Sequence, residues 1–370
     1  MHSKELNKKM FNRNLPNNKL PLLPPKFDFD DVALLKLVNK ANNSLFELKG
    51  MAYVLPNSGI LVSPLSIREA VASNGIENIN TTVEEALKAD VIYEKSERTG
   101  AEKEILSYRD ALREGYMLLR KNGFLNTNSF IKIQSVLEPN KKDIRKISVS
   151  IKNSKTDKII YTPPMGSHVI IDKLKNFEDY FNDKANFDDM DPLIRMAIMH
   201  YQFEAIHPFL DGNGRTGRII MILYLVLTKR LELPILFLSK YILENRDEYY
   251  KKLREVTEEG KWKEWVFYIL QGVDKQAQET KTNILQIKAL INQYKELAFR
   301  NGIKMTPQML DYLFSGPFYS QKKMSASLGV HRNTTAKYFK ELEKLGIVKK
   351  FKNKQENVYY NQKFLKILRY

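Results

Sequence analysis

The stretch His207-Pro-Phe-Leu-Asp-Gly-Asn-Gly-Arg-Thr-Gly-Arg218 lies between two segments with helical patterning. Upstream, Asp191-Pro192 is typical of a helix start, because an aspartate can cap the first turn and proline is tolerated there. Downstream, residues 215–231 contain an apolar run too long for an ordinary strand, and they predict a buried helix. The stretch is therefore predicted to be a glycine-bearing loop that leads from one helix into the N-terminus of the next.

This loop has the features of an anion site. Free backbone N–H groups and the helix dipole favour negative charge at a helix N-terminus. Gly212 and Gly214 would let the backbone approach a phosphate, and the Asn213 amide could donate to a phosphate oxygen. Arg215 and Arg218 are three residues apart, so both could face the same side of the helix. A phosphate-bearing ligand is therefore expected here.

Two further side chains of the stretch suggest chemistry on that ligand. Asp211 offers the hard oxygen ligand that a nucleotide-bound Mg²⁺ needs. His207 is the base-like side chain of the stretch, and a neutral imidazole could take a proton from an attacking hydroxyl. Each element alone is weak, since a lone histidine is more often structural and a lone Gly-x-Gly is usually a turn.

As a whole, the stretch resembles the signature HxFx[DE]GNGRxxR of the Fic (filamentation induced by cAMP) family, and every specified position is met. Residues 203–206 resemble the family's run into this motif. Leu23-Pro24-Pro25, Ala41-Asn42 and residues 48–50 resemble its N-terminal region, so the resemblance covers residues 20–270. It implies an all-α Fic core, with a small β-hairpin flap over the site, that transfers AMP from ATP to Ser, Thr or Tyr of a target protein.

The resemblance also assigns roles to residues. His207 would be the catalytic base, Asp211 the Mg²⁺ ligand, Arg215 the holder of the β-phosphate and Arg218 that of the γ-phosphate. Tyr249, with Tyr241 and Thr257, lies where related sequences line an adenosine pocket, although tyrosines at helical spacing are as often core residues. The implied ATP site consists of Glu77, His207, Gly212, Asn213, Gly214, Arg215, Thr216, Gly217, Arg218 and Tyr249. ATP is the expected substrate and Mg²⁺ the expected cofactor.

The flap of the family would correspond to residues 146–152 and 158–164. The first segment alternates polar and apolar residues and the second ends in Pro163-Pro164, which predicts a short hairpin. In the family, an edge strand of this flap pairs with the target's backbone. The resemblance therefore implies that Ile160, Tyr161 and Thr162 dock the target, with an ordinary hairpin as the alternative.

Residues 73–78 resemble the inhibitory pattern [ST]xxxE[GN] of the family class whose inhibitor precedes the Fic core in the same chain. Ser73 and Glu77 meet the pattern, whereas Gly75 replaces the larger residue often found there. The resemblance implies that the Glu77 carboxylate rests on Arg218 and competes with the γ-phosphate of ATP. The alternative is that Glu77 is a surface residue of a short helix.

The C-terminal residues carry much of the chain's basic character. The formal net charge is +17, and residues 301–370 alone hold 14 Lys and Arg against 4 Asp and Glu. Residues 323–335 predict helix, turn and helix with Gly329 in the turn, Ala326 and Leu328 inside, and a β-wing at residues 348–360. This pattern resembles a winged helix-turn-helix domain. Its recognition helix would expose the DNA-binding candidates Arg332, Asn333, Thr335 and Lys337, although many such domains bind protein instead.

The chain is divided into four parts by these patterns. They are an N-terminal arm and helical region with the inhibitory helix at 1–110, a Fic core at 111–273, a linker helix at 274–300 and a winged helix-turn-helix domain at 301–370. Residues 1–30 are expected to be an extended arm, and residues 83–120 to be helical. The absence of cysteines fits a reducing compartment, and no membrane span or secretory signal is expected, so a cytoplasmic location is predicted.

Three functions follow as hypotheses. The first is a protein adenylyltransferase restrained by Glu77, whose partner is a target protein with an acceptor hydroxyl. The second is a DNA-binding regulator in which the Fic core senses nucleotide. The third is a Fic enzyme that removes AMP or transfers phosphate. DNA and a second copy of the chain are further candidate partners.

Overall fold

The structure is a computed structural model that describes residues 11–51, 53, 57, 59, 62–93, 98, 100–153, 156–183, 189–352 and 357–369. The first ten residues of the expected arm, and residues 154–155 between the two expected hairpin strands, lie outside this described part. Residues 11–31 contain no helix or strand, as predicted for the arm.

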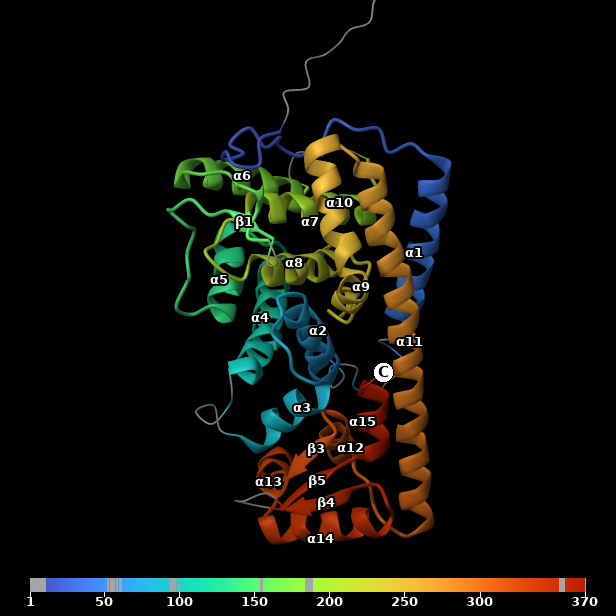
Figure 1. Ribbon diagram of the computed structural model, residues 1–370. Helices are drawn as coiled ribbons and strands as arrows, with labels where there is room; N and C mark the ends of the chain where they lie inside the picture. Colours follow the sequence, from blue (N-terminus) through green and yellow to red (C-terminus); the bar gives the residue numbers. More distant parts are fainter. Residues whose placement is uncertain are drawn as a thin grey trace, which may run out of the picture.

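The described part of the molecule is mostly helical, with two small antiparallel sheets (Figure 1). In chain order the first elements are α1 (Val32–Met51), α2 (Val62–Ile76), α3 (Val83–Ile92), α4 (Gly100–Asn122), α5 (Thr127–Leu137), β1 (Ile151–Lys152), β2 (Ile159–Tyr161), α6 (Ser167–Phe181), α7 (Pro192–Ile206) and α8 (Asn213–Leu227). They are followed by α9 (Leu238–Glu244), α10 (Arg246–Glu259), α11 (Trp262–Arg300), α12 (Pro307–Phe314), β3 (Phe318–Ser320), α13 (Gln321–Leu328), α14 (Arg332–Lys344), β4 (Lys349–Lys352), β5 (Asn357–Tyr360) and α15 (Gln362–Arg369).

Helices α7 and α8 form the centre of the core. The Asp191 side chain caps α7 by accepting from the Leu193 N–H at 2.8 Å, and proline occupies the first turn, as predicted. Most residues of α7 and α8 are buried, including polar ones near the connecting loop. This explains why neither helix has a clear polar face in the sequence. The loop between them is thereby held inside the helical body.

Helix α11 is a 39-residue helix that packs along α1 and continues to the C-terminal elements (Figure 1). Asp274 on α11 accepts from Ser44 at 2.7 Å and pairs with Lys40 at 2.8 Å, both on α1. The helix runs without a break through residue 274, where the linker was expected to begin. The boundary expected after residue 110 likewise falls inside α4. Of the stretch 83–120 with helical patterning, residues 83–92 lie in α3 and residues 100–120 in α4.

The predicted hairpin is present but shorter than expected. Ile151 pairs with Tyr161 and Lys152 with Ile159, in antiparallel register with an irregularity between the two pairs. Residues 146–150 stay outside the strand. The carbonyl of Ile147 accepts from the Arg145 side chain at 3.0 Å instead of from a partner strand.

The C-terminal residues form a helix, turn and helix followed by an antiparallel β4–β5 pair, in the order that the sequence predicts. Gly329 ends α13 in the left-handed conformation, with a φ of 64°. Two details of the prediction were wrong. Met324 is buried in place of Ala326, which is exposed. Thr335 is fully buried, because its position faces the domain interior and its hydroxyl donates to the Arg332 carbonyl at 2.8 Å.

Candidate active site

His207 lies at the junction of α7 and the loop. Its backbone adopts the left-handed conformation with a φ of 48°, and its N–H closes α7 by donating to the Phe203 carbonyl at 3.0 Å. Burial and the nearby Arg145 cation lower the pKa of the imidazole to about 4. The imidazole is therefore neutral at pH 7, which is the form that can accept a proton.

This lowered pKa gives a pH prediction. Burial disfavours the charged imidazole, so the base form persists well below the ordinary histidine value of 6.5 and is lost only as the pH falls through about 4. An activity profile would not isolate this group, because burial raises the pKa of the neighbouring Glu204 to about 7. We therefore expect the imidazole signals of His207, followed by NMR, to titrate well below pH 6.5, and a titration near pH 6.5 would show that His207 is not in this environment.

Two side chains that the sequence analysis assigned to the ATP site, those of Asn213 and Thr216, form hydrogen bonds with the backbone of the loop. The Asn213 amide accepts from the Phe209 N–H and donates to the Phe209 carbonyl, both at 2.8 Å. The Thr216 hydroxyl donates to the Gly212 carbonyl at 2.8 Å, and both side chains are buried. The loop thus uses the oxygen and one of the two N–H donors of the Asn213 amide. The donation to a phosphate oxygen expected from this side chain stays a prediction.

Three glycines shape this helix start. Gly212 precedes α8 with a φ of 76°, a conformation that favours glycine. A Cβ atom at Gly214 would lie 2.6 Å from Glu77 Oε1, and one at Gly217 would lie 2.6 Å from Glu204 Oε1. Both distances are far shorter than side-chain contacts allow. The glycines therefore let two carboxylates approach the backbone of the first turns of α8.

Asp211 is the half-exposed carboxylate of the loop, with 42% of its side chain accessible. It pairs with Lys141 at 2.5 Å and accepts from the Gly212 N–H at 2.8 Å. Burial raises its pKa, but these contacts outweigh burial and lower the pKa overall. No group of three or more acidic, histidine or cysteine residues that could hold a metal occurs among the described residues. A single carboxylate of this kind fits Mg²⁺ that reaches the protein together with nucleotide phosphates and water.

Arg215 and Arg218 both contact residues at the end of α2, so they face the same side of α8, as the three-residue spacing predicts. Arg215 contacts the Asn74 side chain at 3.4 Å, pairs with Glu138 at 2.5 Å and also pairs with Glu104 of α4. Glu138 follows α5, so Arg215 is bound by carboxylates from two helical segments. The side chain expected to hold the β-phosphate is thus held by the chain's own anions in this arrangement.

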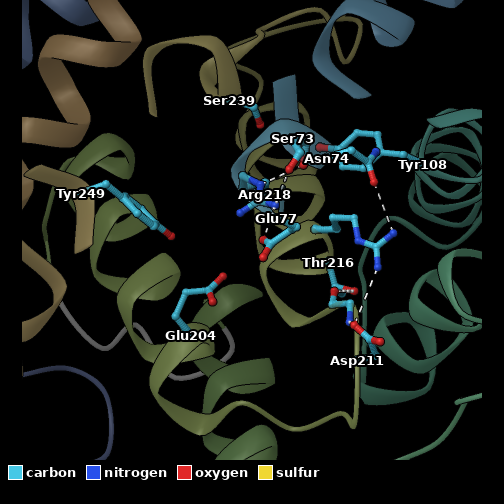
Figure 2. A network of polar contacts seen from close by, with 12 residues as sticks. Ser73, Asn74, Glu77, Tyr108, Glu204, Asp211, Thr216, Arg218, Ser239 and Tyr249 are labelled. Atoms are coloured by element: carbon cyan, nitrogen blue, oxygen red, sulfur yellow. Dashed lines mark hydrogen bonds and ion pairs between the residues drawn. The ribbon is translucent and has the colours of Figure 1, made fainter. Parts of the chain in front are cut away.

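Arg218 is buried, and it donates to Ser73 near the end of α2 and to Glu77 just after it (Figure 2). Its Nε donates to Ser73 Oγ at 2.8 Å, and its Nη2 donates to the Ser73 carbonyl at 3.0 Å and to Glu77 Oε1 at 2.9 Å. Burial disfavours the guanidinium charge, but the carboxylates of Glu77 and Glu204 outweigh it and raise the pKa of Arg218. The expected contact between Glu77 and Arg218 is present, and Glu77 lies over the glycine loop.

Helix α2 is itself anchored by a buried carboxylate that the sequence did not single out. Glu69 accepts from the Ser239 N–H at 3.1 Å and from the Tyr108 hydroxyl at 3.2 Å, and also from the Ser239 hydroxyl. Burial raises the pKa of Glu69 to about 7. These contacts tie α2 to α4 and to the start of α9, and so fix the position from which Glu77 reaches Arg218.

Tyr249 is a buried residue whose hydroxyl lies 2.8 Å from His200 Nε2 and whose ring packs against Trp265. It is near enough to Arg218 and Glu204 to interact with their charges, and Figure 2 shows it in the same network. The Thr257 hydroxyl lies 2.9 Å from that of Tyr201. Both residues therefore have core partners, and their contact with adenosine stays a prediction.

The expected docking strand lies beneath the N-terminal arm. Ile160 is partly exposed, whereas Tyr161 is 8% and Thr162 2% exposed. The Thr162 carbonyl accepts from the Asn17 N–H at 3.0 Å, and the Thr162 hydroxyl donates to the Arg13 carbonyl at 2.7 Å. A target strand that pairs at Thr162 would have to displace the arm, which sequence reasoning did not foresee.

Comparisons with known proteins identify the parts of this chain. Residues 35–117 match the N-terminal domain of the Fic/DOC family, residues 124–225 match the Fic/DOC family, and residues 305–364 match the C-terminal domain of SoFic-like protein adenylyltransferases.

Two curated relatives share part of this sequence. Protein adenylyltransferase fic-1 from Caenorhabditis elegans is 35% identical over 106 residues, which are 29% of this chain and 19% of that protein. Protein adenylyltransferase Fic from Aedes aegypti is 30% identical over 149 residues, which are 39% of this chain and 28% of that protein. The chain thus spans less than a third of the length of these relatives.

Solved structures support the fold. A Fic family protein from Desulfovibrio desulfuricans has a TM-score of 0.57 at 18% identity, covering 91% of this chain and 98% of that one. Residues 134–508 of Fic-1 from C. elegans give a TM-score of 0.52 at 20% identity, covering 67% of this chain and 73% of that one. The motif, the helical core and these matches agree: the chain contains the N-terminal and Fic domains of the Fic/DOC family and a SoFic-like C-terminal domain.

Proposed function

We propose that this chain transfers AMP from ATP to a hydroxyl group of a target protein. The observation that carries the proposal is the neutral, partly buried His207 next to a glycine loop that opens α8, with Arg215 and Arg218 on the same side. The hydroxyl oxygen attacks the α-phosphorus, pyrophosphate leaves, and the imidazole accepts the hydroxyl proton. Positioning and charge stabilisation supply most of the catalysis in such transfers.

Different groups of the site would contact different parts of ATP. Backbone N–H groups at residues 212–214 would face the α-phosphate, and the two arginines would neutralise the β- and γ-phosphates. Asp211 would hold Mg²⁺ once its ion pair with Lys141 is broken. When bound, Mg²⁺ would neutralise phosphate charge. The arginines are now paired with Glu77, Glu104 and Glu138, so ATP has to compete with these carboxylates for them. We infer that this arrangement is the restrained state of the enzyme.

ATP labelled at the α- or at the γ-phosphate tests the proposal. The Glu77→Gly variant, which lacks the carboxylate on Arg218, is incubated with each ATP, Mg²⁺ and an extract containing candidate targets, and label on protein is measured. Label from the α position alone supports AMP transfer. Label from the γ position alone means phosphate transfer, and label from neither, with ATP bound, favours a nucleotide sensor.

A second function is favoured by the C-terminal domain, which we interpret as a winged helix-turn-helix. Arg332, Asn333 and Lys337 are exposed on the first turns of α14, at the end of the chain that carries excess positive charge. The N-terminal residues of such a helix are the ones that reach base edges in helix-turn-helix proteins. Thr335 is buried and does not belong to this candidate surface.

If this domain binds DNA through phosphates, the affinity should fall steeply with salt, by about 10³-fold or more between 50 and 200 mM for six or more contacts. Electrophoretic or fluorescence titration of duplex DNA with the full chain measures this. Arg332→Ala and Lys337→Ala should each weaken binding, and Lys251→Ala, at an exposed position of α10, is the control. No retention on DNA at low salt would favour a protein-docking role.

The described part of the chain contains no helix long and apolar enough to cross a membrane. The cytoplasmic location expected from the sequence stays a prediction. A homodimer stays a prediction.

A further inference from the structure

Arg145 is a buried arginine outside the sequence motif, lying between the hairpin and the active-site loop. It is 2% exposed, and all four hydrogen bonds of its side chain go to backbone carbonyls. Guanidinium groups are seldom fully buried unless they are paired with an anion. A buried cation held only by carbonyls is costly to desolvate, so its placement calls for an explanation.

Its four partners fall into two pairs. The carbonyls of Ile206 and His207, at 3.4 and 2.7 Å, end α7 at the proposed base. The carbonyls of Ile147 and Pro164, at 3.0 and 2.5 Å, flank the two strands of the hairpin. One planar side chain therefore joins both ends of the hairpin to the peptide of His207.

Backbone contacts strengthen the same connection. The Arg145 N–H donates to the Pro208 carbonyl at 3.0 Å, and Ile144 forms a β-bridge with Phe209. The guanidinium also sits at the negative end of the α7 dipole, which partly compensates for its burial. The position of the hairpin is thus defined relative to the residue that would accept the proton.

We propose that Arg145 is a positioning residue that sets the hairpin, and with it the target hydroxyl, at the distance from His207 that AMP transfer requires. This rests on the proposed function, because the hairpin matters for catalysis only if a target docks on it. The same cation contributes to the lowered pKa of His207, as the second cause after burial. Arg145 therefore acts on both the placement and the protonation of the base without touching substrate.

Lysine should not replace this arginine. A planar fork with five donors reaches four carbonyls in different directions, whereas an ammonium has three donors at one point. In the Glu77→Gly background, Arg145→Lys should lower kcat/KM for the target by about 10²-fold, the scale for a misplacement of about 1 Å. ATP binding should stay largely unchanged, because the Arg145 side chain contacts the carbonyls of Ile206 and His207 and not residues 212–218, which are assigned to the phosphates. Arg109→Lys, at a partly buried ion pair with Asp90, is the control for general destabilisation.

A second measurement does not depend on transfer. Titration of the His207 imidazole by NMR should show a higher pKa in Arg145→Met than in the parent chain, and a nearly parental pKa in Arg145→Lys, which keeps the charge. This result would support the role of Arg145 even if no AMP transfer were found. An unchanged kcat/KM in Arg145→Lys, or an unchanged His207 titration in folded Arg145→Met, would overturn it.

Discussion

Glu77→Gly is expected to raise AMP incorporation by about 10²-fold over the parent chain at equal ATP and Mg²⁺. The Glu77 carboxylate accepts from Arg218 Nη2 at 2.9 Å, and one guanidinium edge cannot also hold a γ-phosphate. ATP would then bind with its α-phosphate turned away from the attacking hydroxyl. Removing the carboxylate frees Arg218 and restores the alignment. Incorporation of α-labelled ATP into the chain and into target proteins measures the effect.

Two variants separate the carboxylate from the local backbone. Asn78 has a φ of 63°, so Asn78→Gly loosens the same turn while keeping Glu77, and it should not activate the enzyme. Glu77→Gln keeps the side-chain volume but loses the charge, and it should activate. Arg218→Ala should not mimic Glu77→Gly, because it also removes the γ-phosphate contact. Equal incorporation by the parent chain and Glu77→Gly would leave Glu77 as an ordinary surface residue.

Replacing His207 is expected to lower AMP transfer by about 10²–10⁴-fold, the range for a lost general base. ATP binding should be largely retained, because the backbone cradle and the arginines do not depend on the imidazole. His207 has a φ of 48°, a strained conformation for alanine, whereas asparagine tolerates it. His207→Asn is therefore the better variant, and His207→Ala tests the backbone effect.

Rate and binding have to be measured together for this variant. Calorimetry with ATP shows whether the site is intact, and label incorporation in the Glu77→Gly background shows whether chemistry is lost. A variant that binds ATP and still transfers AMP at the parental rate would remove His207 from the mechanism. Loss of both binding and transfer would show instead that the loop had collapsed.

Much of the site could be predicted because its residues are local in sequence. The loop between two helices, and the turn of α8 that brings Arg215 and Arg218 to one side, follow from spacing within residues 207–218. The contact between Arg218 and Glu77, which are 141 residues apart, was predicted from the resemblance, since nothing in residues 73–78 alone indicates where α2 packs.

The residues that were missed are those whose partners are distant in the chain. Arg145 donates to the carbonyl of His207, which lies 62 residues later in the chain. Glu104 pairs with Arg215, which lies 111 residues later. A lone arginine or glutamate in a helical or loop segment carries no local signal of such pairing. The burial of Thr335 was missed for a related reason. A threonine hydroxyl in a helix can donate to a carbonyl of the preceding turn, and the side chain can then be buried without an unpaired donor.

Intact-protein and peptide mass spectrometry after incubation with unlabelled ATP tests the central claim most directly. Glu77→Gly and the double variant Glu77→Gly/His207→Asn are compared, on the chain itself and on extract proteins. The account predicts a mass increase of one AMP on Ser, Thr or Tyr with Glu77→Gly, and none with the double variant. A mass increase of one phosphate, or AMP added equally by the double variant, would contradict it.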